Sequence, residues 1–450
     1  MRCSLLNRAL EIKGNAVEPY FELAFALESK SLSFFVGTGF SMYLTDGDAP
    51  SWLSLLKDCA KQIDGGDELI DQLFPDDKPI MPLEECASII QAKMHTKGLC
   101  LHEEIAKVID TVKISNFDKP AIEFIKNNDG LKFMTTNYDL LLEKQVLDGL
   151  PVTSYAIGYP VHRQPKGTQV YHVHGSIKYP KKMIVTADDY YRFINRPDYF
   201  SHKVETLFEE NTVVIIGYSL GDINFKSILN KLRSNRQHDI NRQHLFYLSR
   251  SHVDQHIKDY YDRSYGLRVI DGVEVDEFFT ALSEKHSEVS PRVDKYETLL
   301  LPVLEKKKKF TDAYLKKSDS FFEILALLSS NGIIVSHQAV MEVLLDVLER
   351  KRGFTGESGA WEQYVQLAKW LIHLGSIMDI SGTPLEDTYL KAVERSFNNM
   401  SKKQTLGLSW HAFSAWKNHW CDLTYDNRVM VYNYMIEKGV NSDGSEVIEQ

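Results

Sequence analysis

Short runs of apolar residues recur along the first 270 positions of the chain, and polar or glycine residues follow each run. Six such runs cover residues 32–36, 131–134, 170–173, 212–216, 245–248 and 267–270. Apolar runs of four or five residues that end at turn-forming residues are typical of buried strands. Residues 52–127 show helical spacing instead, as at Cys86, Ile89, Ile90 and Met94. Strands that alternate with helices predict an α/β fold with a Rossmann-like, mostly parallel sheet.

Beyond about residue 285 the pattern changes, because apolar residues now stand three and four apart. One such stretch stops near Gly353, and Ser336 is positioned to cap it; its apolar members are Ala339, Val340, Val343, Leu344 and Leu348. Thr383-Pro384 has the form of an N-cap followed by a proline at the first helical position. These features predict that residues 285–450 form an all-helical region without a repeat of fixed period.

Composition agrees with a large globular protein of two domains. The chain has 450 residues, of which 43% are hydrophobic and 25% charged, and single cores stop growing near ~250–300 residues. We therefore expect one domain over residues 1–284 and a second over 285–450. The net charge of -10 provides no general attraction for phosphates, so nucleic acid is not an expected partner.

The cysteine count and the termini indicate a reducing compartment. Five cysteines, without any Cys-x-x-Cys pair, do not suggest a disulfide framework. The first residues lack a signal-peptide pattern, and no apolar run approaches the ~18 residues of a membrane span. We expect a cytoplasmic protein that does not contact the membrane.

Four polar clusters stand where predicted strands end. They are Gly37-Thr38-Gly39-Phe40-Ser41, Thr136-Asn137-Tyr138-Asp139, His174-Gly175 and Gly217-Tyr218-Ser219. Ligands of open α/β sheets bind outside the carboxyl ends of the strands. A Gly-x-Gly turn alone is a weak signal. Four clusters at the same edge of one sheet, however, predict a single pocket.

These four motifs, in this order, resemble the motif set of the sirtuins over roughly residues 30–275. The resemblance implies that Gly37, Thr38, Gly39, Phe40 and Ser41 hold the pyrophosphate of NAD at a helix amino terminus. It further implies that Thr136, Asn137 and Asp139 address the ribose and nicotinamide, and that His174 acts at the ribose hydroxyls. Gly217, Tyr218 and Ser219 would flank the adenosine. The same resemblance suggests that helices within residues 52–127 cover the sheet and form one wall of the pocket.

Two departures separate the chain from sirtuin deacylases. The interval from Ser176 to Ile216 contains no cysteine, whereas structural zinc sites need paired Cys or His ligands at short spacing. Neither zinc nor an acyl-lysine-binding module is therefore expected. In place of the Pro-Asp-Phe-Arg stretch of deacylases, the chain reads Ala49-Pro50-Ser51-Trp52-Leu53. The pattern resembles the sirtuin-like NADases of bacterial antiphage systems, in which NAD itself is the substrate.

The predicted reaction is hydrolysis of the nicotinamide–ribose bond with Asn137 and His174 as the catalytic residues. Asn137 would hold water or ribose in line with the anomeric carbon, and His174 would accept a proton. Because constant destruction of NAD would kill the host, we expect the helical region to mediate homo-oligomerisation or contact with a partner. A HerA-like ATPase or a phage-derived activator are the partners considered. The alternatives are a protein deacylase or ADP-ribosyl transferase, and a non-catalytic sensor of NAD or ADP-ribose.

Several other features have structural interpretations that compete with functional ones. His172 and His174 could share a metal, but no third ligand stands at an obvious spacing, so His172 is expected to be a packed or pocket-lining residue. Asp139 is also a preferred N-cap for a helix from Leu140. The lysine run at 306–309 is expected to be a solvated surface. Helical spacing of an aromatic cluster predicts a core or interface stripe, made by Trp410, Phe413, Trp416 and Trp420.

Overall fold

A seven-stranded, all-parallel sheet forms the centre of the molecule. The computed structural model describes residues 19–160, 164–195, 199–219, 245–331 and 337–449, together with residues 226, 229 and 333. The strands are β1 (Leu32–Val36), β2 (Lys132–Thr135), β3 (Val152–Ala156), β4 (Thr168–His172), β5 (Thr212–Ile216), β6 (Leu245–Ser249) and β7 (Leu267–Asp271). Their order is β3-β4-β2-β1-β5-β6-β7, with every neighbouring pair parallel. The predicted Rossmann-like sheet is confirmed.

Strand β1 is central, and the strand order reverses beside it. The chain runs from β1 to the β2 side, builds β4 and β3 there, and then returns to β5 on the other side of β1. Such a switch point leaves a crevice at the carboxyl ends of the strands. All five residues of β1 and of β5 are buried, as expected for strands covered on both faces.

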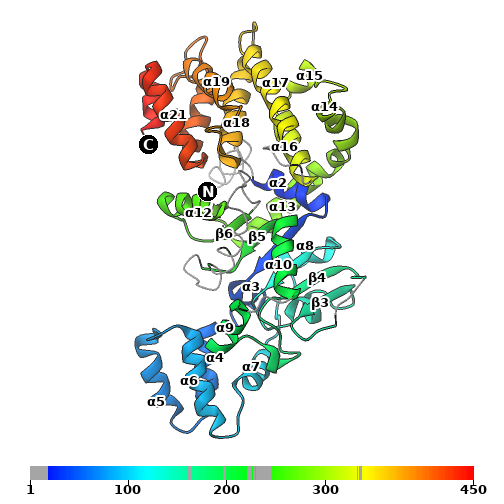
Figure 1. Cartoon of the computed structure of the whole chain (residues 1–450), viewed down its shortest axis with the longest axis vertical. Coiled ribbons are helices and arrows are strands. Elements are labelled where there is room, and N and C mark those ends of the chain that lie inside the picture. The colour runs from blue at the N-terminus through cyan, green and yellow to red at the C-terminus, as the bar shows by residue number, and fades with distance from the viewer. Residues whose placement is uncertain are drawn as a thin grey trace.

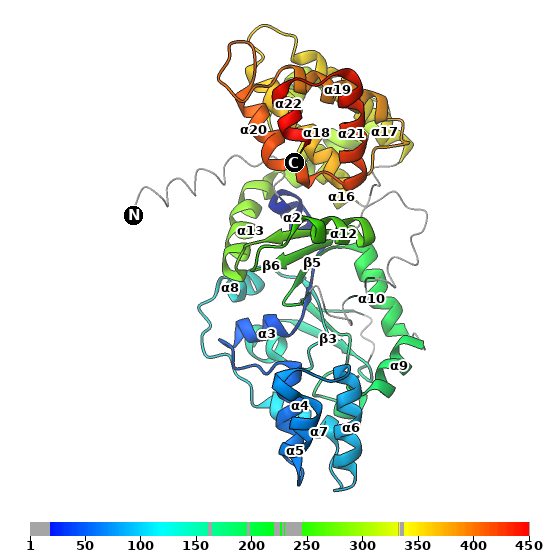
Figure 2. The same ribbon diagram turned by 90° about the vertical axis from the view of Figure 1, so that its left-hand side faces the viewer.

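Helices cover both faces of the sheet (Figures 1 and 2). On one face, helices α2 (Pro19–Glu28), α8 (Pro120–Asn127) and α13 (Val275–Val289) pack together, and Phe34 of β1 contacts Phe124 and Phe279 from two of them. On the other face, Phe35 meets Phe208 of α10 (Tyr199–Glu210). Helix α12 (Gln255–Tyr265) packs beside β7.

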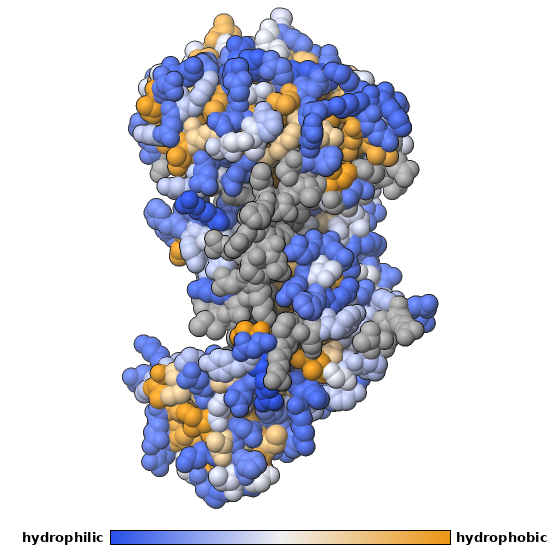
Figure 3. Space-filling view, in the orientation of Figure 1, coloured by the Kyte–Doolittle hydropathy of each residue, from blue (hydrophilic) through white to orange (hydrophobic). Residues whose placement is uncertain are grey.

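A separate helical module follows the glycine turn and extends away from the strand ends, at the lower end of Figure 1. After the short α3 (Thr38–Leu44), it consists of α4 (Trp52–Ala60), α5 (Gly66–Leu73), α6 (Leu83–His95) and α7 (Leu101–Asp110). Its buried side chains form their own apolar core around Leu56, Ile90 and Ile105. The expectation that residues 52–127 cover the sheet holds for α8, whereas α4–α7 project from its edge. Figure 3 shows apolar side chains on the outer surface of this module too, where Ile80 is 56% exposed.

The region after α13 is helical, as predicted. Its longer helices are α16 (Ser320–Ser330), α17 (Gln338–Phe354), α18 (Trp361–Ile377), α19 (Glu386–Asn398), α20 (Trp410–His419), α21 (Tyr425–Lys438) and α22 (Ser442–Ile448), and shorter ones are α14 (Leu301–Leu304) and α15 (Asp312–Leu315). Between these helices, the described residues make only an isolated bridge from Met400 to Ser409.

Two predicted helix starts differ from the observed ones, by one and by two residues. Helix α17 is capped by His337, whose side chain accepts a hydrogen bond from the Ala339 amide, and Ser336 lies outside the described residues. Helix α19 begins only at Glu386. Thr383 instead opens a turn, because its carbonyl accepts from the Glu386 amide and its hydroxyl from the Leu385 amide.

One apolar core joins the sheet to the carboxyl-terminal helices. Helix α2 packs on α13 and also on α16, where Phe21 meets Phe322 edge to face. The buried residues form one continuous cluster from Leu23 to Ile448. The predicted boundary at residue 285 falls inside α13.

The remaining sequence features fit the surface and core assignments. Lys306, Lys307 and Lys309 pair with acidic residues of the chain itself. In the aromatic cluster, Phe413, Trp416 and Trp420 are buried, whereas Trp410 is 42% exposed. Within the part of the chain that the structure describes, no helix has the length and apolar character needed to cross a bilayer.

Candidate active site

The four strand-end motifs meet at one pocket, between the carboxyl ends of the strands and the α4–α7 module. The volume is about 900 Å³, including its open mouth. Of the residues predicted for the site, the lining includes Thr38, Ser41, Thr136, Asn137, Asp139, His174, Gly217, Tyr218 and Ser219. Convergence of the motifs on one pocket is therefore what the structure shows.

The glycines of the first motif allow two loops to pack backbone to backbone. The Gly37 amide donates to the Ile216 carbonyl (2.9 Å) and the Gly39 amide to the Gly217 carbonyl (3.0 Å). A Cβ atom on Gly39 would lie 2.9 Å from the Gly217 Cα atom, and one on Gly217 would lie 2.3 Å from the Phe40 nitrogen. Neither Gly37 nor Gly39 lines the pocket. Their local role is to bring the ends of β1 and β5 together.

This packing corrects two details of the predicted phosphate site. The amide of Gly39 is bonded to Gly217, and the Phe40 amide donates to the Gly37 carbonyl (2.9 Å). Both donors are thus engaged within the protein. The Phe40 side chain is 1% exposed and packs toward Phe279 in the core, with ring centroids 6.5 Å apart. Phe40 is not among the residues that line the pocket.

Ser41 links the two residues of the second motif. Its hydroxyl donates to Asp139 Oδ2 (2.7 Å) and accepts from Asn137 Nδ2 (2.8 Å), while Thr38 Oγ1 lies 3.5 Å from Asn137 Oδ1. Asp139 Oδ1 accepts from the Leu141 amide (3.1 Å), so this residue also caps the helical turn that follows. Desolvation by the surrounding protein raises the pKa of Asp139, although the hydrogen bond from Ser41 opposes the shift. The network fixes the side chain of Asn137 against α3.

A buried ion pair between His172 and Glu143 holds the backbone of Asn137 through its carbonyl oxygen. His172, 1% exposed, places Nε2 at 2.7 Å from Glu143 Oε1 and Nδ1 at 3.2 Å from the Asn137 carbonyl oxygen. A carboxylate and a carbonyl only accept hydrogen bonds, so both contacts require the doubly protonated imidazolium. Against the effect of burial, Glu143 raises the pKa of His172 and His172 lowers the pKa of Glu143. Glu143 escaped the sequence analysis, because a lone glutamate within a helical stretch carries no recognisable signal.

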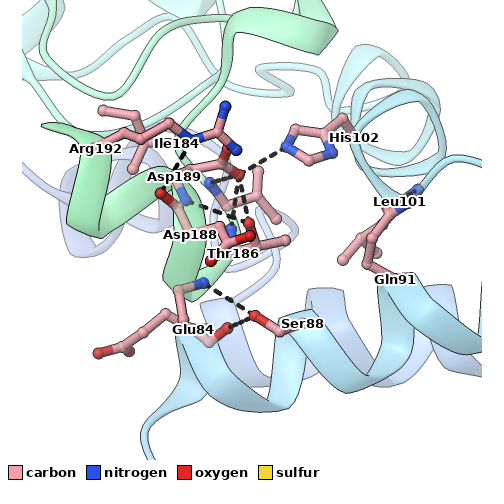
Figure 4. Close-up of polar contacts among 12 residues, drawn as sticks. Glu84, Ser88, Gln91, Leu101, His102, Ile184, Thr186, Asp188, Asp189 and Arg192 are labelled. Carbon is pink, nitrogen blue, oxygen red and sulfur yellow. Dashed lines mark hydrogen bonds and ion pairs between the residues drawn. The ribbon is translucent and has the colours of Figure 1, made fainter.

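His174 follows β4 and is held by aromatic rings of helix α9 (Ala187–Asn195). Its ring meets Tyr190 and Phe193 edge to face, at centroid distances of 5.3 and 5.7 Å. Asp189, which directly precedes Tyr190 in the sequence, accepts from the Thr186 amide and hydroxyl and from His102 Nε2 at 3.0 Å (Figure 4). These bonds lower the pKa of Asp189 against the opposing effect of its burial. Helix α9, and with it the rings around His174, is therefore attached to α7.

The third side of the pocket is formed by Tyr218. Its hydroxyl is 2.6 Å from Thr136 Oγ1, and its ring stacks on Phe35 with centroids 4.8 Å apart. The carbonyl of Tyr218 accepts from the Tyr247 hydroxyl (2.6 Å). Thr136 and Tyr218, predicted to bind cofactor, thus contact each other across the strand ends.

Sequence reasoning missed most of the apolar wall. Ala49, Pro50, Trp52, Leu55, Ile109, Val112, Tyr138 and Tyr190 also line the pocket. Trp52 meets Tyr138 edge to face, and the Tyr138 hydroxyl donates to the Ile184 carbonyl. Helical spacing identified the helices that form this wall, as expected, but gave no sign of which apolar residues face a ligand. Among the described residues, no group of three or more His, Cys, Asp or Glu side chains is arranged to hold a metal.

Part of this pocket lies in a segment that is similar to known proteins. Residues 131–270 match the family model of the SIR2-like domain. This part of the chain is similar to a SIR2-like domain. It is 25% identical to the defense-associated sirtuin 2 of Bacillus subtilis over 266 residues, which cover 58% of this chain and 25% of that protein. It is 26% identical to the NAD(+) hydrolase ThsA of Bacillus cereus (strain MSX-D12) over 117 residues, covering 25% of this chain and 24% of that protein.

The predicted kinship with sirtuin-like antiphage proteins is thereby confirmed. The matched parts span about a quarter of the length of each relative. The match of the SIR2-like domain starts at the strand before Asn137 and ends in β7, so it contains the second, third and fourth motifs.

Proposed function

We propose that this SIR2-like protein hydrolyses NAD⁺ at the nicotinamide–ribose bond, giving nicotinamide and ADP-ribose. The observation that carries the proposal is the meeting of Asn137 and His174 at one pocket, from the ends of β2 and β4. The name of the relative ThsA, an NAD(+) hydrolase, supports the same chemistry.

In this proposal, the bond between the ribose C1′ atom and the pyridinium nitrogen breaks, and nicotinamide leaves with the electron pair as a neutral base. Water adds to C1′ and releases a proton, which His174 accepts and passes to solvent. Asn137, held by Ser41 and by His172, would orient the water or the ribose. Fixing a nucleophile in near-attack geometry contributes several kcal/mol, and general base catalysis adds roughly 10²–10⁴-fold.

The apolar wall has a place in the same scheme. Trp52 and Leu55 of α4 and Ile109 of α7 face the pocket from the side opposite the sheet. Apolar walls with a few placed polar groups are common in cofactor pockets, and they limit the access of water. We assign this wall to the nicotinamide ring, and the surroundings of Tyr218 and Ser219 to the adenosine.

We further propose that the activity serves antiphage defence through NAD⁺ depletion in the cytoplasm, and that it is controlled. Support comes from the name of the relative, a defense-associated sirtuin. Control would act through the helical region, by homo-oligomerisation, by a HerA-like ATPase, or by a phage-derived activator.

The decisive experiment measures nicotinamide release from NAD⁺ by purified protein. Asn137→Ala and His174→Ala are each expected to lose at least 100-fold, whereas His256→Ala, on the exposed side of α12, is the matched control and should retain full activity. Full activity in either site variant would contradict the proposal. Binding of NAD⁺ without turnover, also after addition of phage lysate, would favour a sensor. Release that requires an acyl-peptide would favour a deacylase.

A further inference from the structure

Helix α21 carries an apolar stripe on its outer surface. Tyr425, Val429, Tyr432 and Ile436 are between 41% and 49% exposed, and we call them the α21 stripe. Their spacing of four, three and four residues places them on one face of the helix. The buried face is a different one, made by Asn427, Val431 and Met435. Figures 1 and 2 agree in placing α21 at the outside of the molecule.

The stripe is presented on a firmly attached helix. Asn427 Nδ2 donates to the carbonyls of Gly375 (2.8 Å) and Met378 (2.7 Å), and its Oδ1 accepts from the Ile380 amide (2.9 Å). Arg428 pairs with Asp259 of α12. Arg263 lies over the Tyr425 ring (5.4 Å) and 3.8 Å from Asp426. A surface fixed in this way pays little ordering entropy on association.

We propose that the α21 stripe pairs with the same stripe of a second copy of this chain, with the two helices antiparallel. The spacing of four, three and four residues is that of successive a and d positions of a coiled coil, which face the partner helix. A two-fold axis between Val429 and Tyr432 would place Val429 against Tyr432 of the second copy, and Tyr425 against its Ile436. Each apolar residue of the stripe then meets an apolar partner, as the isologous interface of a two-fold dimer requires.

The exposed charges at the two ends of the stripe are compatible with the antiparallel arrangement. Arg263, 65% exposed in its side chain, stands beside Tyr425, and the exposed Glu437 follows Ile436. Antiparallel pairing brings Arg263 of each copy alongside Glu437 of the other. Parallel pairing would instead bring two Arg263–Asp426 pairs together at one end, and two Glu437 side chains, each followed by the exposed Lys438, at the other. Like charges held together at an interface are unfavourable.

The flanks of the stripe are compatible with this pairing. Beside the stripe, Asp426, which lies 3.8 Å from Arg263 of its own copy, and Asn433 of the other copy would stand near each other, a carboxylate against an amide that can donate to it. Four side chains alone are fewer than a standard interface of ~20–30 residues a side provides. Helix α12, joined to α21 through Asp259, adds the exposed Ile257 and Tyr260.

The test is the solution mass of the full chain, measured by light scattering after gel filtration. Wild-type protein should have an even number of copies. In the proposed pair, Val429 of each copy faces Tyr432 of the other, which makes two apolar layers. Val429→Glu and Tyr432→Lys should each halve the mass, because each substitution puts a charge into both layers. Trp361→Glu, a matched change at an exposed apolar residue at the start of α18, should leave the mass unchanged. A monomeric wild type, or wild-type mass in both α21 variants, would overturn the proposal.

An equimolar mixture of the two charged variants tests the register. In a mixed pair, Glu at 429 faces Lys at 432 in one layer, while the other layer keeps the native Tyr432 and Val429. The mixture should therefore recover the wild-type mass that neither variant has alone, and failure to recover would overturn the antiparallel register. If either variant proves misfolded by circular dichroism, oxidation of the variant V429C/Y432C replaces this test. A disulfide-linked dimer supports the pairing, and its absence contradicts it.

Discussion

At the scale of single residues, the structure gives a physical reason for the glycine motif that the sequence could not reveal. A Gly-x-Gly turn after a strand reads as a phosphate cradle, but Gly39 and Gly217 are needed because two backbones touch. The polar residues of the pocket were predictable, since they occupy strand ends. Glu143, Tyr190 and His102 were not, because each acts through a neighbour that lies far away in the sequence.

Replacement of Gly217 by alanine tests whether the glycines are needed for the close contact of two backbones rather than as a phosphate cradle. Gly217 has φ +78°, and an added Cβ atom would lie 2.3 Å from the Phe40 nitrogen. Gly272, with φ +68°, has nothing within 4 Å of an added Cβ atom. Gly272→Ala should therefore lose only the ~1–2 kcal/mol of a left-handed alanine. Gly217→Ala should lose clearly more free energy of unfolding in urea titrations, and nicotinamide release with it. Equal losses would show that the loop packing is not tight.

The His172–Glu143 ion pair predicts a pH-dependent contribution to stability. The folded pKa of His172 is raised above its ordinary 6.5, so its contribution is complete below pH 6.5 and is lost as pH rises through the folded value. Glu143 is shifted down from 4.5, so its contribution is complete above pH 4.5 and is lost as pH falls through its folded value. The pair is strongest between these limits. Wild type minus His172→Gln should give a Tm difference that shrinks from pH 6 to pH 9.

The matched variant for that measurement is Glu143→Gln, which removes the charge that raises the pKa of His172. In the Glu143→Gln variant, the loss of stability that His172 causes as the pH rises above 6.5 should disappear. The reason is that protonation of His172 no longer stabilises the fold. A Tm difference between wild type and His172→Gln that stays constant over the whole range would mean that the imidazole is neutral, and the proposed double donation would be wrong.

At the scale of elements, burial decided what the sequence could predict. Strands β1 and β5 were predicted with their observed limits because all their residues are buried and all but Ser33 and Thr212 are apolar. Strand β3 was missed, since it lies at the sheet edge and buries only two of five residues, Thr153 and Ala156. The start of α19 was misplaced because a Thr-Pro pair suits both a helix cap and the turn that Thr383 forms.

Asn427 provides a prediction for the attachment of α21 to α18. The residue is fully buried, and its side chain makes three hydrogen bonds to backbone groups. Asn427→Ala would leave buried donors and acceptors without partners, at about 1–3 kcal/mol each, so we expect a loss of about 2–5 kcal/mol in urea unfolding. Asn427→Asp should lose at least as much, because a carboxylate would face two carbonyl oxygens. Gln404→Ala, at an exposed amide, should change stability by less than about 0.5 kcal/mol. A small effect of both Asn427 variants would show that water replaces these bonds.

At the scale of the whole molecule, the change of pattern near residue 285 is real, but it does not coincide with a gap in the packing. Residue 285 lies within α13, which rests on α2 and α8, and α2 in turn packs on α16 of the helical region. A sequence shows where periodicity changes, whereas the continuity of a core depends on which faces meet in space. The sheet and the carboxyl-terminal helices share one apolar cluster, while α4–α7 have another.

A fragment of residues 1–284 tests whether the predicted boundary separates two independent domains. The cut removes the end of α13 and all of α16, and would uncover the face of α2 that packs on α16, where Phe21 meets Phe322. We expect the fragment to lack a cooperative thermal transition in near-ultraviolet circular dichroism, since exposure of a large core face removes the burial on which folding depends. The full chain should instead lose its sheet and its carboxyl-terminal helices in one transition. If the fragment melts cooperatively near the Tm of the full chain, the boundary at 285 is a true domain boundary, and α16 is a docked helix whose release could transmit a signal from the helical region to the pocket.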